Sequence, residues 1–136
     1  MANNSRSIWA EPLPDDCPHS DAQTPNGDVV YRLTSAYPPI EKDFFSQSKL
    51  HPERKFKDEC IARALSVHNS LAASKNVQKL PSQKENRYIV KLTLTNNSGV
   101  IKQTGKDINH ISWWQKRNFN PLEHCELFGH TENGSL

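Results

Sequence analysis

The chain has 136 residues, the usual size of one domain and too few for two domains with separate cores. Lysine and arginine number 17 and aspartate and glutamate 15, so the net charge of +2 does not by itself indicate a nucleic-acid-binding protein. No run approaches the roughly 18 apolar residues of a membrane span, and no apolar signal segment follows the first residues. We therefore expect one domain without a membrane or secretory segment.

Residues 1–27 are expected to form a proline-rich, mostly irregular and disordered leader. Its prolines fix φ and remove backbone donors, which disfavours both helix and central strand. Ile8, Trp9 and Leu13 are the bulky apolar residues of this segment. They either pack back onto the domain or form a short segment that docks on a partner, so Trp9 is a candidate binding residue.

A single α+β domain is expected over residues 28–128, followed by a frayed tail at 129–136. A turn at 26–28 precedes a predicted strand over 29–33, whose apolar residues indicate burial. A helix is predicted over 53–65, because apolar residues recur there at helical spacings opposite a charged face.

Residues 65–68 fit two interpretations. They either continue that helix or form a short strand. In the second case, Asn69 or Ser70 caps a second helix that runs through Lys79.

The clearest strand covers residues 88–95, where an apolar run passes into alternating leucine and threonine. A hairpin turn predicts a returning strand at 100–103, and an extended segment follows over 108–114. Residues 122–128 close the fold as a strand or short helix. Together these elements predict an α+β fold: a small mixed or antiparallel sheet of about four or five strands, with one or two helices on one face. The 53–65 helix would cover the hairpin.

Cysteine usage indicates a reducing compartment. Cys17, Cys60 and Cys125 are odd in number and lack CxxC spacing, so a disulfide framework is not expected and a cytoplasmic location is the simpler interpretation. Cys60 lies on the apolar stripe of the predicted helix, where thiols are usually inert. His124, Cys125 and His130 lack the paired spacings of a zinc site, so we predict no metal and no cofactor.

The most unusual local feature is the tryptophan pair at 113 and 114, followed by two cations. In an extended chain adjacent side chains point to opposite faces, so one ring can lie in the core while the other stays near the surface. An amphipathic ring beside cations suits a protein interface, a nucleobase or a small-molecule lid. The candidate binding residues are therefore Trp9, Trp113, Trp114, Lys116 and Arg117, with core packing of both tryptophans as the alternative.

Arg32 and His110 are candidates for chemistry. Arg32 interrupts an apolar strand, where it either occupies an edge or solvent-facing position or clamps an anion such as phosphate. His110 shares a face with Trp114 and can orient or deprotonate a substrate group, although most such histidines are structural.

The order of elements loosely resembles that of ADP-ribosyltransferase-type folds. Residues 31–33 carry an arginine, residues 65–67 carry a serine before an alanine-containing helix, and the strand over 88–94 follows. The resemblance covers about a dozen scattered residues and implies that Arg32 and Ser66 hold a dinucleotide. The late catalytic glutamate of such enzymes has no matching context at Glu123 or Glu126.

No complete catalytic motif is present, which favours a non-enzymatic accessory or adaptor domain that binds a protein partner. One alternative is a small nucleotide-handling enzyme or binding domain, in which Arg32, Ser66 and His110 converge in one concave site. A second is a nucleic-acid-binding module that uses basic clusters at 49–57 and 102–117 together with an exposed tryptophan.

Overall fold

The computed structural model describes residues 8–130. Its strands are β1 (Asp28–Thr34), β2 (Leu65–His68), β3 (Tyr88–Leu94), β4 (Gly99–Gln103), β5 (His110–Gln115) and β6 (Glu126–His130). Its helices are α1 (Gln47–Leu50), α2 (Glu59–Ala62) and α3 (Leu71–Gln78), with 3-10 turns η2 (Glu41–Phe44), η3 (Pro81–Gln83) and η4 (Pro121–Glu123). The predicted α+β class is confirmed.

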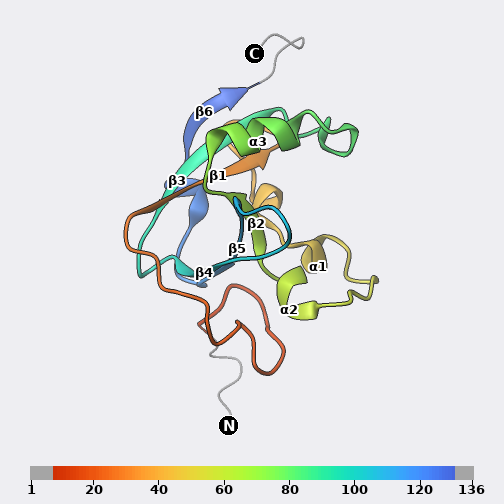
Figure 1. The fold of residues 1–136 in the computed structure, drawn as a ribbon, viewed down its shortest axis with the longest axis vertical. Helices are drawn as coiled ribbons and strands as arrows, with labels where there is room; N and C mark the ends of the chain where they lie inside the picture. The colour runs from red at the N-terminus through yellow and green to blue at the C-terminus, as the bar shows by residue number, and fades with distance from the viewer. Residues whose placement is uncertain (1–7, 131–136) are drawn as a thin grey trace.

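All six strands belong to one antiparallel sheet with the spatial order β4-β5-β2-β1-β3-β6 (Figure 1). The sheet therefore has slightly more strands than the four or five expected. Helix α3 packs against β1 and β2, while the short helices α1 and α2 lie together beyond the other end of β2 (Figure 1).

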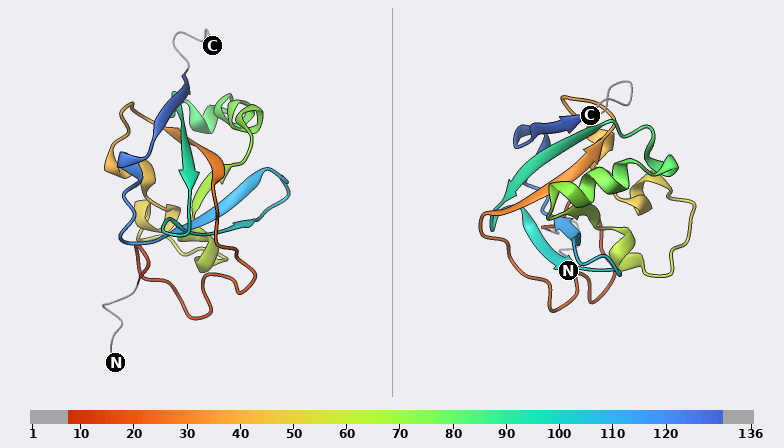
Figure 2. Two further views of the ribbon diagram at one scale, coloured as in Figure 1. Left: turned by 90° about the vertical axis from the view of Figure 1, so that its left-hand side faces the viewer. Right: turned by 45° about the horizontal axis from the view of Figure 1, so that its top comes forward.

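The sheet consists of two three-stranded halves that meet at a single residue pair. β1 pairs with β3 along its whole length, from Asp28 opposite Leu94 to Thr34 opposite Tyr88. β1 and β2 share only the pair Tyr31 and His68. Beyond this pair the hydrogen-bond ladder is interrupted, and Figure 2 shows the two halves splaying apart. We call the unpaired stretch between residues 32–34 and 65–67 the sheet opening.

Two hydrophobic clusters lie on opposite faces of the sheet. The larger contains Val30, Phe44, Leu65, Val67, Val90, Leu92, Leu94, Ile111 and Trp113. The smaller is built around Cys60, Ala64 and Trp114. As predicted, Trp113 and Trp114 point to opposite faces. The interpretation that both pack in the core is confirmed, and the one that leaves a ring near the surface is wrong, because they are 0% and 1% exposed.

Residues 8–27 explain the burial of the second tryptophan. Trp9 forms an isolated bridge with Lys116, and Gln23 forms one with Ile101. Trp9 and Leu13 pack against the cluster that contains Trp114. Of the two interpretations of the leader, the structure therefore shows packing back onto the domain for residues 8–27; residues 1–7 lie outside the described part of the chain.

The helix predicted over 53–65 is wrong for most of its length. Helix α2 begins only after Asp58, whose carboxylate accepts a 3.0 Å hydrogen bond from the Ile61 backbone N–H. The residues that suggested a helical stripe divide between two roles: Cys60 packs against Trp114 on one face, whereas Leu65 enters β2 and the larger cluster.

The alternative of a strand followed by a capped helix is confirmed for residues 65–78. β2 pairs with β5, and the Ser70 hydroxyl accepts a 3.2 Å hydrogen bond from the Ala73 backbone N–H at the start of α3. α3 ends at Gln78, close to the expected Lys79.

The predicted hairpin of residues 88–95 and 100–103 is wrong, although both segments are strands. β3 pairs with β1 and β6, whereas β4 pairs with β5. The turn at 95–98 is closed by the Ser98 N–H, which donates to the Thr95 carbonyl. Gly99 then leaves it with φ of +133°, so that the chain diverges from β3 and meets Gln115 instead.

Cys17 and Cys60 form a disulfide, so the expectation that the cysteines are unpaired is wrong for these two. The bond is at odds with the expected reducing compartment. It links the N-terminal segment to α2 across the smaller cluster. No helix within residues 8–130 is long and apolar enough to cross a membrane.

Candidate functional site: a groove around Phe119

The loop after β5 is held at both ends by hydrogen bonds. The Lys116 N–H donates to the Ser98 carbonyl at 3.1 Å, and the Phe119 N–H donates to the Lys116 carbonyl at 3.2 Å. At the far end, Asn120 Oδ1 accepts a 3.1 Å hydrogen bond from the Leu122 N–H and so caps η4. These bonds fix the direction in which Phe119 projects.

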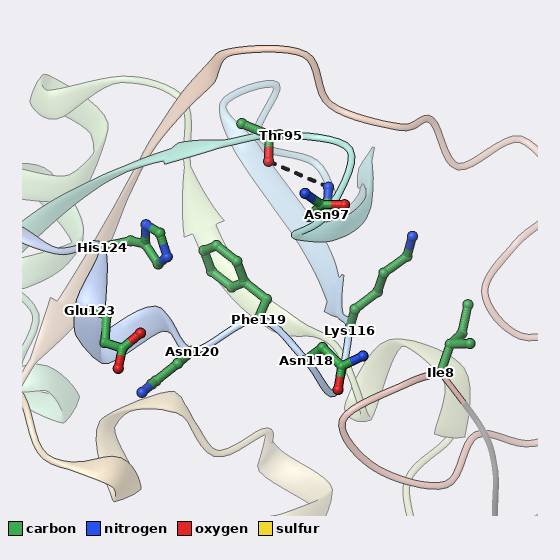
Figure 3. Close-up of a pocket in the computed structure, with 9 residues that line it drawn as sticks. All are labelled: Ile8, Thr95, Asn97, Lys116, Asn118, Phe119, Asn120, Glu123 and His124. Atoms are coloured by element: carbon green, nitrogen blue, oxygen red, sulfur yellow. Dashed lines mark hydrogen bonds between the residues drawn. The ribbon is translucent and has the colours of Figure 1, made fainter.

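A cavity lies on each side of this loop, and Phe119 and Asn120 line both. The first has a volume of about 550 Å³ (Figure 3) and is lined by Ile8, Thr95, Asn97, Lys116, Asn118, Phe119, Asn120, Glu123 and His124. The second, of about 300 Å³, is lined by Glu41, Phe44, Phe45, Lys49, Gln115, Arg117, Phe119, Asn120, Pro121 and Leu122. We call the two together the Phe119 groove.

Phe119 anchors the groove to the larger core cluster. Its ring meets Trp113 edge to face, with centroids 5.8 Å apart. The exposed His124 ring stacks on it at a centroid distance of 4.6 Å and an interplanar angle of 18°. Figure 3 shows the two rings facing one another beside the loop. A stacked aromatic pair held from below offers a flat surface for another planar ring.

Polar groups surround this ring pair. The Lys116 ammonium is 3.2 Å from the Asn96 carbonyl oxygen, at the wall opposite His124 (Figure 3). Within residues 8–130, the side-chain amide of Asn118 forms no hydrogen bond, although Asn118 lines the first cavity. A side-chain amide carries both donors and an acceptor, so Asn118 can pair with the edge of a base or with a hydroxyl.

Positive side chains outnumber acidic ones in the groove lining. Lys116 lines the first cavity, and Lys49 and Arg117 line the second. The acidic residues are Glu41 and Glu123. This excess favours an anionic ligand.

Two of the predicted binding residues, Lys116 and Arg117, line the groove. The remaining predicted binding residues lie elsewhere: Trp113 is beneath Phe119, while Trp9 and Trp114 belong to the smaller cluster on the other face.

Comparison with known proteins gives no further guide to the site. The chain matches no protein-family model, no curated protein and no solved structure.

Arg32 lies in the sheet opening. β1 has neighbours on both sides, so the expected edge position is wrong. The Arg32 Nε–H donates to the Asp43 carbonyl at 2.8 Å, and Nη1–H donates to the Ser66 carbonyl at 2.7 Å. Phe44 lies against the guanidinium, 5.8 Å from its ring centroid. Burial lowers the pKa of Arg32 to about 10, so the side chain remains charged at neutral pH.

Ser66 and His110 are in direct contact, with Ser66 Oγ 3.1 Å from His110 Nε2. Strand alternation places these two side chains on the face opposite Arg32, because Tyr31 pairs with His68 and His68 pairs with His110. The predicted convergence of all three side chains in one concave site is therefore wrong: Ser66 and His110 are in contact, whereas Arg32 reaches only the Ser66 carbonyl from the other face.

Cys125, the cysteine considered above beside His124, is half-buried. No cluster of three or more potential ligands occurs among the described residues. Burial raises the pKa of the Cys125 thiol to about 12, and its Sγ–H donates to the Pro121 carbonyl at 3.0 Å. Cys60, expected above to be an inert thiol, is in the disulfide and carries no thiol.

Phe119, His124 and Asn118 were missed as site residues. Residues 118–121 read Asn-Phe-Asn-Pro, which indicates a break in the extended chain. The signal that marks the site is an aromatic residue between two asparagines in that break, because a phenylalanine in a polar turn has to pack on something nearby. His124 stands five residues further on, at a distance that only the 3-10 turn η4 makes short.

Proposed function

We propose that the protein binds a small anionic ligand with a planar ring, of the nucleotide class, in the Phe119 groove. The observation that carries this proposal is the stacked pair of Phe119 and His124 in the same cavity as Lys116. A nucleotide combines a flat base with a phosphate, and the cavity offers a flat aromatic surface and an ammonium group.

The size and polarity of the groove support a ligand of this class. Ligand pockets usually have volumes of about 300–1,000 Å³ and a few well-placed polar groups. The first cavity, of about 550 Å³, lies in this range. Asn118 supplies donors and an acceptor for a base edge or a ribose, and Glu123 supplies an acceptor.

The positions of the tryptophans in the structure weaken the hypothesis that they bind a protein partner. Trp113 and Trp114 are both buried within the single chain. Trp9 is half-buried against the smaller cluster. The exposed aromatic ring that the binding hypothesis needs is that of His124, which lines the groove together with the cations Lys116 and Arg117.

Titration with ADP, followed by amide chemical shifts and calorimetry, tests the proposal. Saturable binding is expected, with shifts centred on residues 116–124. Lys116→Gln should weaken the affinity about tenfold, because it removes one charged contact of roughly 1.4 kcal/mol. Asn118→Ala should weaken it less. The matched control is Lys106→Gln, an exposed lysine outside the groove lining, which should leave the affinity unchanged.

Parallel titrations with adenosine and with inorganic phosphate separate the two halves of the ligand. Weak binding of each, with tighter binding of ADP, supports the proposal. No saturable binding of ADP at millimolar concentration would reject it. Tight, steeply salt-dependent binding of an oligonucleotide with no binding of ADP would favour the nucleic-acid-binding module instead.

A second proposal keeps a protein partner and places it at α3. Leu80 is 51% exposed and Ile108 is 75% exposed. A cavity of about 420 Å³ beside them is lined by Val77 and Leu80 from the end of α3 and by Asp107 and Asn109 from the loop before β5. Exposed aliphatic residues beside such a hollow are typical of interaction surfaces.

The pair Ile108→Asp and Ile40→Asp tests this surface, because Ile40 is another exposed isoleucine, at 50%, and lies outside the α3 cavity. A partner that copurifies with the wild type and with Ile40→Asp, but is lost with Ile108→Asp, would support the proposal. Equal recovery with both variants would contradict it.

A further inference from the structure

We infer that Ser66 and His110 form a nucleophile and general-base pair that can hydrolyse carboxylic esters. The pair does not line the Phe119 groove, so this inference does not depend on the ligand proposed there. It stands on three observations: the contact between the two side chains, the hydrogen bond that fixes the imidazole, and the Ser66 backbone edge that faces the sheet opening.

The first observation is the contact itself. Ser66 Oγ lies 3.1 Å from His110 Nε2, within the distance at which a hydroxyl donates to an imidazole nitrogen. Ser66 is exposed, so an incoming substrate can reach the hydroxyl. The two residues come from adjacent strands, where His110 sits opposite His68 and thus diagonal to Ser66.

The second observation is the orientation of the imidazole. His110 Nδ1 lies 3.1 Å from the backbone carbonyl oxygen of Thr104, which can only accept a hydrogen bond. We therefore assign the proton to Nδ1. The Thr104 hydroxyl, 3.2 Å from the same nitrogen, then donates to the Ser112 hydroxyl at 2.7 Å and not to the imidazole. In a neutral ring this leaves Nε2 with a free lone pair directed at Ser66, which is the tautomer that a general base requires.

Thr104 is a positioning residue in this arrangement. Its hydroxyl lies 2.7 Å from the Ser112 hydroxyl in a buried contact, and its N–H donates to the His110 carbonyl at 3.2 Å. These two contacts tie Thr104, which follows β4, to β5, and so fix the position of the carbonyl oxygen that accepts from Nδ1. The same logic of nucleophile, base and orienting acceptor is found in hydrolases of unrelated folds.

The third observation is the environment of the Ser66 backbone. The Ser66 carbonyl accepts from Arg32 across the sheet opening. In an extended strand the N–H and C=O of one residue point to the same edge, so the Ser66 N–H also faces the opening. The guanidinium lies on the opposite face and already donates to backbone carbonyls, so the Ser66 N–H is the donor at this edge. A backbone N–H of the nucleophile itself can stabilise the oxyanion that forms when a serine attacks a carbonyl.

The reaction proceeds in two balanced steps. Ser66 Oγ bonds to the acyl carbon while its proton passes to His110 Nε2, and the ester C–O bond breaks as the alcohol leaves with that proton. A water molecule then attacks the acyl carbon and gives a proton to Nε2. The bond to Ser66 breaks, the serine oxygen regains the proton, and the carboxylic acid leaves.

The test uses the full chain with p-nitrophenyl acetate and a fluorophosphonate probe. The wild type should hydrolyse the ester above the background rate, and the probe should modify Ser66, as located by peptide mass mapping. Ser66→Ala should abolish both signals. Ser82→Ala, which removes another exposed serine, should keep both at the wild-type level. His110→Gln should slow both about 100-fold or more, the usual contribution of a general base.

Ser66→Ala removes an exposed side chain and is expected to fold, so the test does not depend on the stability of His110→Gln. Labelling of Ser66 no faster than that of Ser82 would overturn the inference. So would ester hydrolysis that survives in Ser66→Ala. ADP binding by Ser66→Ala should equal that of the wild type, which keeps this outcome separate from that of the groove.

Discussion

The guanidinium of Arg32 bridges the sheet opening by donating to the Ser66 carbonyl oxygen 2.7 Å away. A second hydrogen bond, from Nε–H to the Asp43 carbonyl, attaches the same side chain to η2. β1 and β2 share only the pair Tyr31 and His68, so the Ser66 carbonyl has no partner N–H from β1. The Arg32 side chain donates the hydrogen bond that a continuous ladder would otherwise provide. The two halves of the sheet are therefore joined through a cation.

Replacing Arg32 with methionine, which preserves much of the length, should destabilise the protein by about 2–4 kcal/mol. The Ser66 and Asp43 carbonyls lose charged donors, each worth about 1.5–3 kcal/mol before the apolar replacement is counted. Urea denaturation measures the change. Arg87→Met, at an exposed position, is the control and should alter the stability by less than about 0.5 kcal/mol. Equal stability of the two variants would contradict the bridging role.

The disulfide of Cys17 and Cys60 should contribute about 4 kcal/mol to the free energy of unfolding. It joins residues separated by 43 positions, and the chain-entropy relation for a loop of this length gives that value. Denaturation of the wild type with and without reductant measures it. The double variant Cys17→Ser with Cys60→Ser should match the reduced wild type and should not respond to reductant. A wild type that is insensitive to reductant would disprove this contribution.

Gly99→Ala should destabilise the protein by about 3 kcal/mol or more. A Cβ at this position would overlap the carbonyl oxygen of Trp114, and the φ of +133° is itself unfavourable for alanine. Gly27→Ala is the matched control, because Gly27 also has a positive φ, +83°, but an added Cβ would meet no heavy atom within 4 Å. That variant should lose only about 1 kcal/mol. Thermal denaturation separates the two, and similar losses would show that strain rather than the clash decides.

Stability should fall when the pH drops below 6.5, in part because of His68. Burial, together with the neighbouring His110, lowers the pKa of His68 below its ordinary value of 6.5. As the pH falls through 6.5, the unfolded chain binds a proton at His68 and the folded chain does not. Acidification therefore lowers the free energy of the unfolded state relative to the folded state. The contribution is present above pH 6.5 and is lost below it, at up to about 1.4 kcal/mol per pH unit.

His68→Gln removes this titration. Urea denaturation at pH 7.5, 6.5 and 5.5 should show a smaller loss of stability on acidification for the variant than for the wild type. Parallel losses in the two proteins would exclude His68 as a cause.

The strands could be predicted from the sequence because a strand with one buried face alternates apolar and polar residues, with a two-residue period. β3 shows it most clearly: Leu92 and Leu94 are fully buried while Thr93 is exposed. The period says nothing about which strands pair. The expected hairpin failed because the turn before Gly99 directs β4 away from β3 and toward β5.

The site was harder to predict because its residues are brought together by a turn and by tertiary packing, which the sequence pattern does not specify. Lys116 and Arg117 were found from their charge beside aromatic residues. Phe119 and His124 are joined by a turn whose geometry the residue types alone do not reveal. Burial of both tryptophans depends on residues 8–27, which cover the second face; the apolar residues of this segment fitted packing onto the domain and docking on a partner equally well.

The order of the strands has a consequence for synthesis on the ribosome. β2 finds its outer neighbour in β5, and β3 finds its outer neighbour in β6, the last strand of the described chain. Until the C-terminal segments have left the ribosome, one half of the sheet therefore lacks its middle strand, β5, and the other lacks its outer strand, β6. Folding dominated by such distant pairings is slow, and the nascent chain presents unpaired strand edges throughout elongation.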